Sequence, residues 1–187
     1  MKSNTQVSLQ LLSRKAIRFC LLFACCLFST ISIGQNLVSN GSFEQLTSCP
    51  SNSGQIDSAI GWWGVQSPDL LNSCATNSAL SVPSNFDGTQ SAYDGDGYIV
   101  FASYLEPPSF DAREYVQTQL IDSLEENKKY YLLFQISFGD ILQYASDGIG
   151  AFLSMDTVYG VGLGQIIDSI PQVQVPEGVP IIDKTNW

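Results

Sequence analysis

The 187-residue chain carries eighteen acidic residues against eight basic ones, a net charge of −10, and it has no histidine. This acidic balance disfavours nucleic acids and anionic membrane surfaces as partners and favours cationic partners or divalent metals. Without histidine, Ser-His-Asp and Cys-His catalysis are excluded, and the usual zinc sites are disfavoured. The sequence also has no phosphate loop, dinucleotide fingerprint or basic patch.

Residues 1–34 are predicted to be a secretory signal peptide. Four basic residues in the first eighteen positions precede an apolar run at 19–33, and Ser32 and Gly34 place small residues before a cleavage point at Gln35. The run is shorter than the roughly twenty residues that cross a bilayer, and no later segment is long and apolar enough to do so. The alternatives are a retained N-terminal anchor or a lipoprotein leader ending at Cys25. The prediction places the protein outside the cell or at its surface.

Removal of residues 1–34 changes both the charge and the cysteine count. Four basic residues remain against eighteen acidic ones, a net charge of −14, and only Cys49 and Cys74 remain of the five cysteines. An even pair in an oxidising compartment predicts a disulfide that closes a loop of about 25 residues. Two buried free thiols or two metal ligands are the alternatives.

The residues from 35 onward are enough for one domain, and their pattern predicts an all-β antiparallel sandwich. Short β-type runs alternate with clusters of Gly, Pro, Asn, Asp and Ser, and no segment has a capped period of 3.6 over three turns. The predicted strands are 37–38 with 42–43, broken at Asn40-Gly41, then 98–104, 113–120, 129–138 and 149–155. The strand at 129–138 is the clearest, because every second residue from Tyr130 to Phe138 is apolar.

Two long segments read as loops or extended chain. Residues 47–58 and 68–85, on either side of Trp62-Trp63, have loop composition, and Cys49 and Cys74 would tie them together. Near the C-terminus, Pro171, Pro176 and Pro180 space out an extended segment that ends at Trp187. This ending predicts a sandwich that lacks its last strands.

Several spaced motifs resemble one family. The run Asn36-Leu37-Val38-Ser39-Asn40-Gly41-Ser42-Phe43-Glu44 is similar to the first strand of jelly-roll, galactose-binding-like modules. Further motifs follow in order: Ser48-Cys49-Pro50, Gly61-Trp62, Pro68-Asp69-Leu70-Leu71-Asn72-Ser73-Cys74, Val82-Pro83-Ser84-Asn85-Phe86, Gly88-Thr89-Gln90 and Arg113-Glu114-Tyr115-Val116-Gln117. Together they resemble a carbohydrate-binding-like module of secreted and outer-membrane-associated Bacteroidota proteins, which often stands N-terminal to an OmpA-like domain or a type IX sorting tail. The resemblance implies a jelly-roll fold and a place at the cell envelope.

The resemblance also implies a structural calcium ion, with Glu44 as one ligand. Calcium needs six to eight oxygens, so Glu44 supplies only part of the shell, and a capping or surface role is the alternative. Asp94-Gly95-Asp96-Gly97 also invites a calcium-loop interpretation. The flanking helices and later glutamate of an EF-hand are missing, however, and Asp-Gly repeats are common in hairpin turns. The turn is the preferred interpretation.

Trp62, Trp63 and Asp69 form the candidate ligand site. Neighbouring residues of an extended segment point to opposite faces, so one tryptophan is expected in the core and the other outside. Trp62, in the Gly-Trp of the family pattern, is the core candidate. Trp63 is the candidate platform for a sugar ring, and Asp69 would accept hydrogen bonds from sugar hydroxyls.

The sequence therefore predicts a secreted, non-catalytic module that binds a glycan or cell-wall polysaccharide, or has an adhesion-like role, at the cell envelope. A structural or spacer domain of a larger envelope protein, without a small ligand, is the first alternative. A carboxylate-based glycoside hydrolase is the second, although no pair among the eighteen acidic residues stands out.

Overall fold

The computed structural model describes residues 34–104, 113–159 and 166–187. The chain divides into two units, Met1–Asn36 and Leu37–Trp187. The predicted signal peptide belongs to the first unit and, apart from Gly34, lies outside the described residues. Among the residues that are described, no helix is long and apolar enough to cross a membrane.

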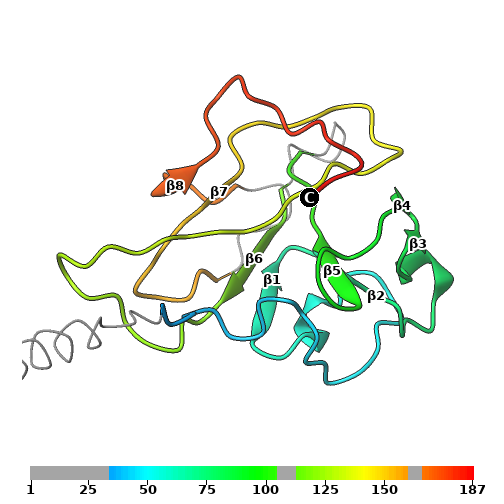
Figure 1. Cartoon of the computed structure of the whole chain (residues 1–187), viewed down its shortest axis with the longest axis horizontal. Coiled ribbons are helices and arrows are strands. Elements are labelled where there is room, and N and C mark those ends of the chain that lie inside the picture. Colours follow the sequence, from blue (N-terminus) through cyan, green and yellow to red (C-terminus); the bar gives the residue numbers. More distant parts are fainter. Residues whose placement is uncertain (1–33, 105–112, 160–165) are drawn as a thin grey trace, which may run out of the picture. The chain divides into compact units, whose positions relative to one another are not determined.

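The described part of the second unit consists of short strands, loops and two 3-10 helices (Figure 1). The strands are β1 (Trp62–Val65), β2 (Asp69–Asn72), β3 (Ser84–Asn85), β4 (Gly88–Thr89), β5 (Gly97–Val100), β6 (Tyr115–Thr118), β7 (Gly150–Ala151) and β8 (Val173–Gln174). The 3-10 helices are η1 (Ile56–Ser58) and η2 (Ser78–Leu80). All strand pairs are antiparallel, and they form two-stranded ribbons: β1 with β6, β2 with β5, β3 with β4, and β7 with β8. The prediction of an all-β, antiparallel chain with little helix is confirmed at this level.

The buried core lies around β1, β2 and the two 3-10 helices. Its buried apolar side chains are Ile56, Ala59, Val65, Leu70, Leu71, Leu80 and Tyr98. Gly64 lets β1 approach its neighbours closely, because a Cβ atom there would lie 2.5 Å from Cγ of Pro68 and 2.9 Å from Cγ2 of Ile56. This close packing fixes β1, and with it the two tryptophans, against the core.

Three predicted strands are confirmed over part of their lengths. The strand expected at 98–104 is β5, the one at 113–120 is β6, and the one at 149–155 is the two-residue strand β7. Their ends differ because hydrogen bonding to a partner, rather than side-chain pattern, defines where a strand stops.

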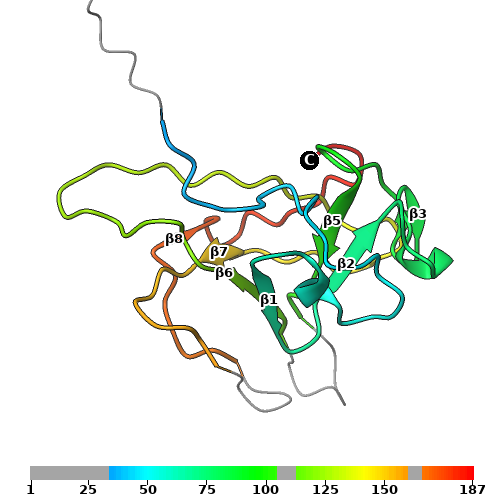
Figure 2. The ribbon, with the colours of Figure 1, turned by 90° about the horizontal axis from the view of Figure 1, so that it is seen from below.

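The strand predicted at 129–138 is wrong. In the described structure these residues have no ladder partner and run as a chain without arrows (Figures 1 and 2). The alternation is present only in part: Leu132 and Phe134 are 43% and 44% exposed and Tyr131 and Leu133 are 96% and 83% exposed, but Gln135, Ile136, Ser137 and Phe138 are all partly exposed. Alternating side chains alone do not make a strand, because a strand also needs a neighbour to accept its backbone hydrogen bonds.

The segment predicted as the first strand is mostly a turn that is centred on Asn40. Val38 makes only an isolated antiparallel bridge to Leu120. Asn40 is buried and has a left-handed φ of 50°. Its side-chain Nδ2 donates to the carbonyl oxygens of Gln45 (3.0 Å) and Ile60 (2.9 Å), and its Oδ1 accepts from the Gln45 N–H (2.9 Å). One side chain thus attaches the opening segment to the chain just before β1.

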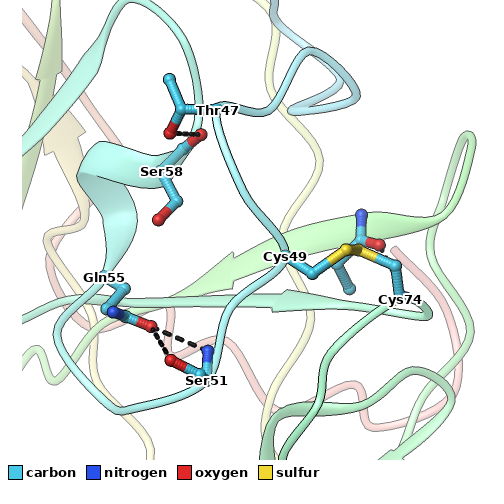
Figure 3. The surroundings of a disulfide bond; sticks show 7 residues. Thr47, Cys49, Ser51, Gln55, Ser58 and Cys74 are labelled. Carbon is cyan, nitrogen blue, oxygen red and sulfur yellow. Dashed lines mark hydrogen bonds between the residues drawn. A yellow bond between two sulfur atoms is a disulfide. The ribbon is translucent and has the colours of Figure 1, made fainter.

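The predicted tie between the two loop segments is confirmed. Cys49 and Cys74 form a disulfide with a Cα–Cα distance of 5.6 Å (Figure 3). Hydrogen bonds support it on both sides: the Thr76 N–H donates to the Pro50 carbonyl (3.1 Å), and the Ser51 N–H donates to Oε1 of Gln55 (2.8 Å). The loop interpretation of 68–85 is wrong in part, because β2, η2 and β3 fall inside it. Strands of two to four residues are too short for their alternation to be recognised.

The C-terminal segment packs against distant parts of the unit. Within it, β8 lies between Pro171 and Pro176 and pairs with β7. The Trp187 indole N–H donates to the Ser91 carbonyl (2.8 Å), and its ring lies edge-on to Tyr98 at 5.1 Å. Trp187 therefore joins the side chains around β5.

Candidate functional site

Trp62 is a packing residue. Its ring lies 4.8 Å from that of Phe43 in a tilted arrangement, and its indole N–H donates to the Asn40 carbonyl (2.9 Å). Aromatic contact and a satisfied indole N–H are typical of a structural tryptophan. Trp62 therefore attaches β1 to the opening segment.

Trp63 lies on the opposite face of β1, because successive strand residues alternate. The antiparallel register places it directly across from Gln117 of β6, and Val65 across from Tyr115. Trp63, Tyr115 and Gln117 are all partly exposed, whereas Val65 on the same face is buried. We call the three partly exposed residues the Trp63 face. It combines an indole, a phenol and an amide, the groups with which proteins contact sugar rings and hydroxyls.

Two side chains of the Trp63 face are held by the backbone of later segments. The Gln117 amide donates to the Val158 carbonyl (2.8 Å) and accepts from the Val158 N–H (3.2 Å), and the Tyr115 hydroxyl accepts from the Ile167 N–H (3.1 Å). These bonds fix the orientation of both side chains. Among the described residues, they leave Gln117 with a second N–H and a second lone pair, and Tyr115 with its O–H. The face is therefore ordered without using all of its hydrogen-bonding capacity.

Asp69 belongs to a different ribbon, since it begins β2 and pairs with Val100 of β5. Its Oδ1 accepts a hydrogen bond from the Gly54 N–H (2.6 Å). Burial raises the pKa of Asp69, as does the nearby Glu114 carboxylate, while the Gly54 N–H and the Ser53 hydroxyl act in the opposite direction. No interaction recorded among the described residues joins Asp69 to Trp63. Asp69 ties β2 to the 51–55 loop rather than extending the Trp63 face.

Glu44 and the Asp94-Gly95-Asp96-Gly97 turn, two separate candidates for calcium, lie together. One carboxylate oxygen of Glu44, Oε1, accepts from the Asp96 N–H (2.8 Å) and the Gly97 N–H (3.1 Å). Gly95 has a φ of 71°, and any Cβ there would collide with the Glu44 carboxylate. The glycine is therefore required both by the turn and by the close approach of Glu44.

This geometry suits a carboxylate that caps a turn better than one that holds a cation. Two N–H groups point at the Glu44 oxygen, and a cation would be repelled by those same dipoles. In the part of the chain that the structure describes, no group of three or more Asp, Glu, Cys or His residues is arranged to hold a metal. Calcium binding by Glu44 stays a prediction, and these residues fit it poorly.

Tyr115 and Gln117 belong to the candidate site, although the sequence alone did not single them out as binding residues. Their signal was the alternation in 113–120, which places both on one face of the strand. That this face lies beside Trp63 depends on the pairing of β6 with β1, two strands about fifty residues apart. No local pattern encodes such a pairing.

In comparisons with known proteins, no family model, curated protein or solved structure matches the chain.

Proposed function

We propose that the chain from Leu37 onward is a non-catalytic glycan-binding module of jelly-roll type that acts at the cell envelope or outside the cell. The short antiparallel ribbons and the order of the sequence motifs support the fold. The disulfide supports an oxidising compartment, where such bonds persist. The acidic composition argues for a neutral or cationic ligand rather than a nucleic acid.

The observation that carries the binding proposal is the pairing of Trp63 with Gln117. A partly exposed indole on a β-ribbon can stack on the apolar face of a pyranose, and the amide directly across the strand can bond to a hydroxyl on the ring edge. The flanking Tyr115 hydroxyl offers a further donor. Because backbone contacts already orient Gln117 and Tyr115, little side-chain entropy is lost on binding.

A pull-down on insoluble and immobilised polysaccharides tests this proposal. The panel should include peptidoglycan, alginate, laminarin and host-type glycans. We expect retention on at least one of them and its loss in Trp63→Ala. Tyr131→Ala is the matched control, because Tyr131 is 96% exposed and lies outside the Trp63 face. Absence of binding across the panel would refute the proposal, and glycan hydrolysis that one Asp or Glu substitution abolishes would overturn its non-catalytic part.

A structural domain of a larger envelope assembly is the second candidate. Its support is the set of large apolar side chains exposed between residues 130 and 182, among them Leu133 at 83% and Ile170 at 86%. Exposed apolar side chains mark an interaction site where they form one surface. This candidate predicts no glycan binding and, in intact cells, reproducible cross-linking of this surface to one envelope component.

A further inference from the structure

Two Asp-Gly pairs from distant parts of the chain interlock. Asp87 and Gly88 lie in the β3–β4 hairpin, and Gly139 and Asp140 lie in the 139–142 loop. A Cβ atom on Gly139 would lie 2.6 Å from Oδ2 of Asp87, and one on Gly88 would collide with the Asp140 side chain. Each carboxylate therefore sits against the glycine of the other loop. We call this arrangement the Asp87–Asp140 clasp.

Backbone hydrogen bonds complete the clasp. The Thr89 N–H donates to Oδ2 of Asp140 (2.8 Å), and the Ile141 N–H donates to the Asp87 carbonyl (3.4 Å). The second distance is at the long end for a hydrogen bond, so that contact is weak. The hairpin and the loop thus meet through one strong bond, one weak bond and two carboxylates.

The clasp also supports the C-terminal segment. Nζ of Lys184 donates to the carbonyl oxygens of Asp140 (2.6 Å) and Leu142 (3.1 Å) and lies 5.1 Å from the centre of the Phe138 ring. Residues 183–187 are therefore attached to the same loop that carries Asp140. If the loop moves away from the hairpin, the anchor of Lys184 moves with it.

The titratable groups that act on Asp87 are all acidic. Asp140 in the loop, Asp69 on β2 and the Tyr98 phenol on β5 interact with it electrostatically, whereas the Lys184 ammonium is bound to carbonyl oxygens. Burial raises the pKa of Asp87, and the charges of Asp140 and then Asp69 raise it further. An ionised Asp87 is thus less stable in the closed clasp than in water.

We propose that the clasp is a conformational device that acid strengthens: a proton held by Asp87 keeps the hairpin, the 139–142 loop and the C-terminal segment together, and loss of that proton loosens them. The direction follows from linkage. A carboxyl whose pKa is raised by closure binds its proton more tightly in the closed form, so closure is favoured at low pH. This contribution is lost as the pH rises from about 4, the ordinary value for aspartate, through the raised pKa of Asp87.

Amide hydrogen exchange of Thr89 and Ile141, measured by NMR on the whole protein and corrected for intrinsic rates, tests the proposal. We expect their protection to fall about threefold or more between about pH 4 and pH 7. Asp87→Asn keeps the shape of the side chain but cannot ionise, so both amides should retain their acid-level protection throughout. Asp57→Asn is the control, an exposed aspartate on η1, and it should behave as the wild type does.

Asp140→Asn provides an independent arm, because it removes the repulsion from the other loop while leaving an oxygen for the Thr89 N–H. It should reduce the pH dependence without abolishing it, because burial still raises the pKa of Asp87. Wild-type protection that is constant or rises with pH would overturn the proposal. So would a wild-type pH dependence that persists unchanged in both Asp87→Asn and Asp140→Asn.

Discussion

Replacing Asn40 by alanine is expected to destabilise the Leu37–Trp187 unit more than any other single change in the opening segment. Asn40 is buried, and its side chain makes three hydrogen bonds, two to carbonyl oxygens and one to an N–H. These bonds fix the chain before β1 and so hold the strand that carries both tryptophans. Alanine offers neither the donor nor the acceptor.

The magnitude follows from the bonds and the backbone. Three hydrogen bonds at about 1 kcal/mol net each give a loss of about 3 kcal/mol. Asn40 has a φ of 50°, a left-handed conformation that asparagine tolerates and alanine does not, and this adds about 1 kcal/mol. The sum of about 4 kcal/mol is a large share of the total stability of an ordinary domain.

Urea unfolding of the wild type, Asn40→Ala, Asn40→Gly and Asn40→Asp measures these contributions separately. Glycine accepts the left-handed φ, so Asn40→Gly isolates the loss of the hydrogen bonds. Asn40→Asp keeps the acceptor but turns a carboxylate oxygen toward the carbonyls of Gln45 and Ile60, so its stability should recover as the pH falls and the carboxyl is protonated. A loss below about 0.5 kcal/mol in Asn40→Ala would refute the role assigned to Asn40.

The other predictions concern the disulfide and two carboxylates. Cys49→Ser with Cys74→Ser should lower the free energy of unfolding by about 3 kcal/mol, as measured with urea, and no change on reduction of the wild type would contradict the predicted tie. Glu44→Ala should lower the free energy of unfolding by about 1 to 2 kcal/mol, and Glu44→Gln by less, because glutamine keeps an acceptor. A rise in the Tm of the wild type with calcium that is absent in Glu44→Gln would instead support the metal role. In the wild type, the raised pKa of Asp69 makes its ionisation unfavourable in the folded state, so the free energy of unfolding should fall as the pH rises above about 4. Asp69→Asn should weaken this fall, and an unchanged pH profile would argue against the burial effect.

The sequence predicted well those features that depend on local chemistry. The disulfide followed from cysteine parity and compartment, and the β-type runs at 98–104 and 113–120 contain β5 and β6. The strand at 129–138 failed because alternation reports only which side chains share a face. Whether another strand lies alongside depends on contacts far away in the sequence, and in the described structure none does.

The candidate site was predictable to a similar degree. Alternation in the Trp62-Trp63 pair predicted one packing and one outward tryptophan. The contacts of Trp62 agree with a packing role, but both tryptophans are partly exposed, so the outward role of Trp63 stays a prediction. The pairing of Trp63 with Gln117 could not be read from the sequence, because cross-strand neighbours depend on register. Asp69 was placed with Trp63 because it is close in sequence, but the chain turns at Gln66, with a φ of 70°, and enters another ribbon.

The most direct test of glycan binding is an NMR titration of the labelled protein with a soluble oligosaccharide from the polysaccharide that retains it. The indole N–H of Trp63 and the side-chain amide of Gln117 should shift progressively with ligand. The indole N–H of Trp62, which is bonded to the Asn40 carbonyl, should not. Binding that leaves the Trp63 and Gln117 signals unchanged, or that shifts only residues elsewhere, would contradict the proposed site.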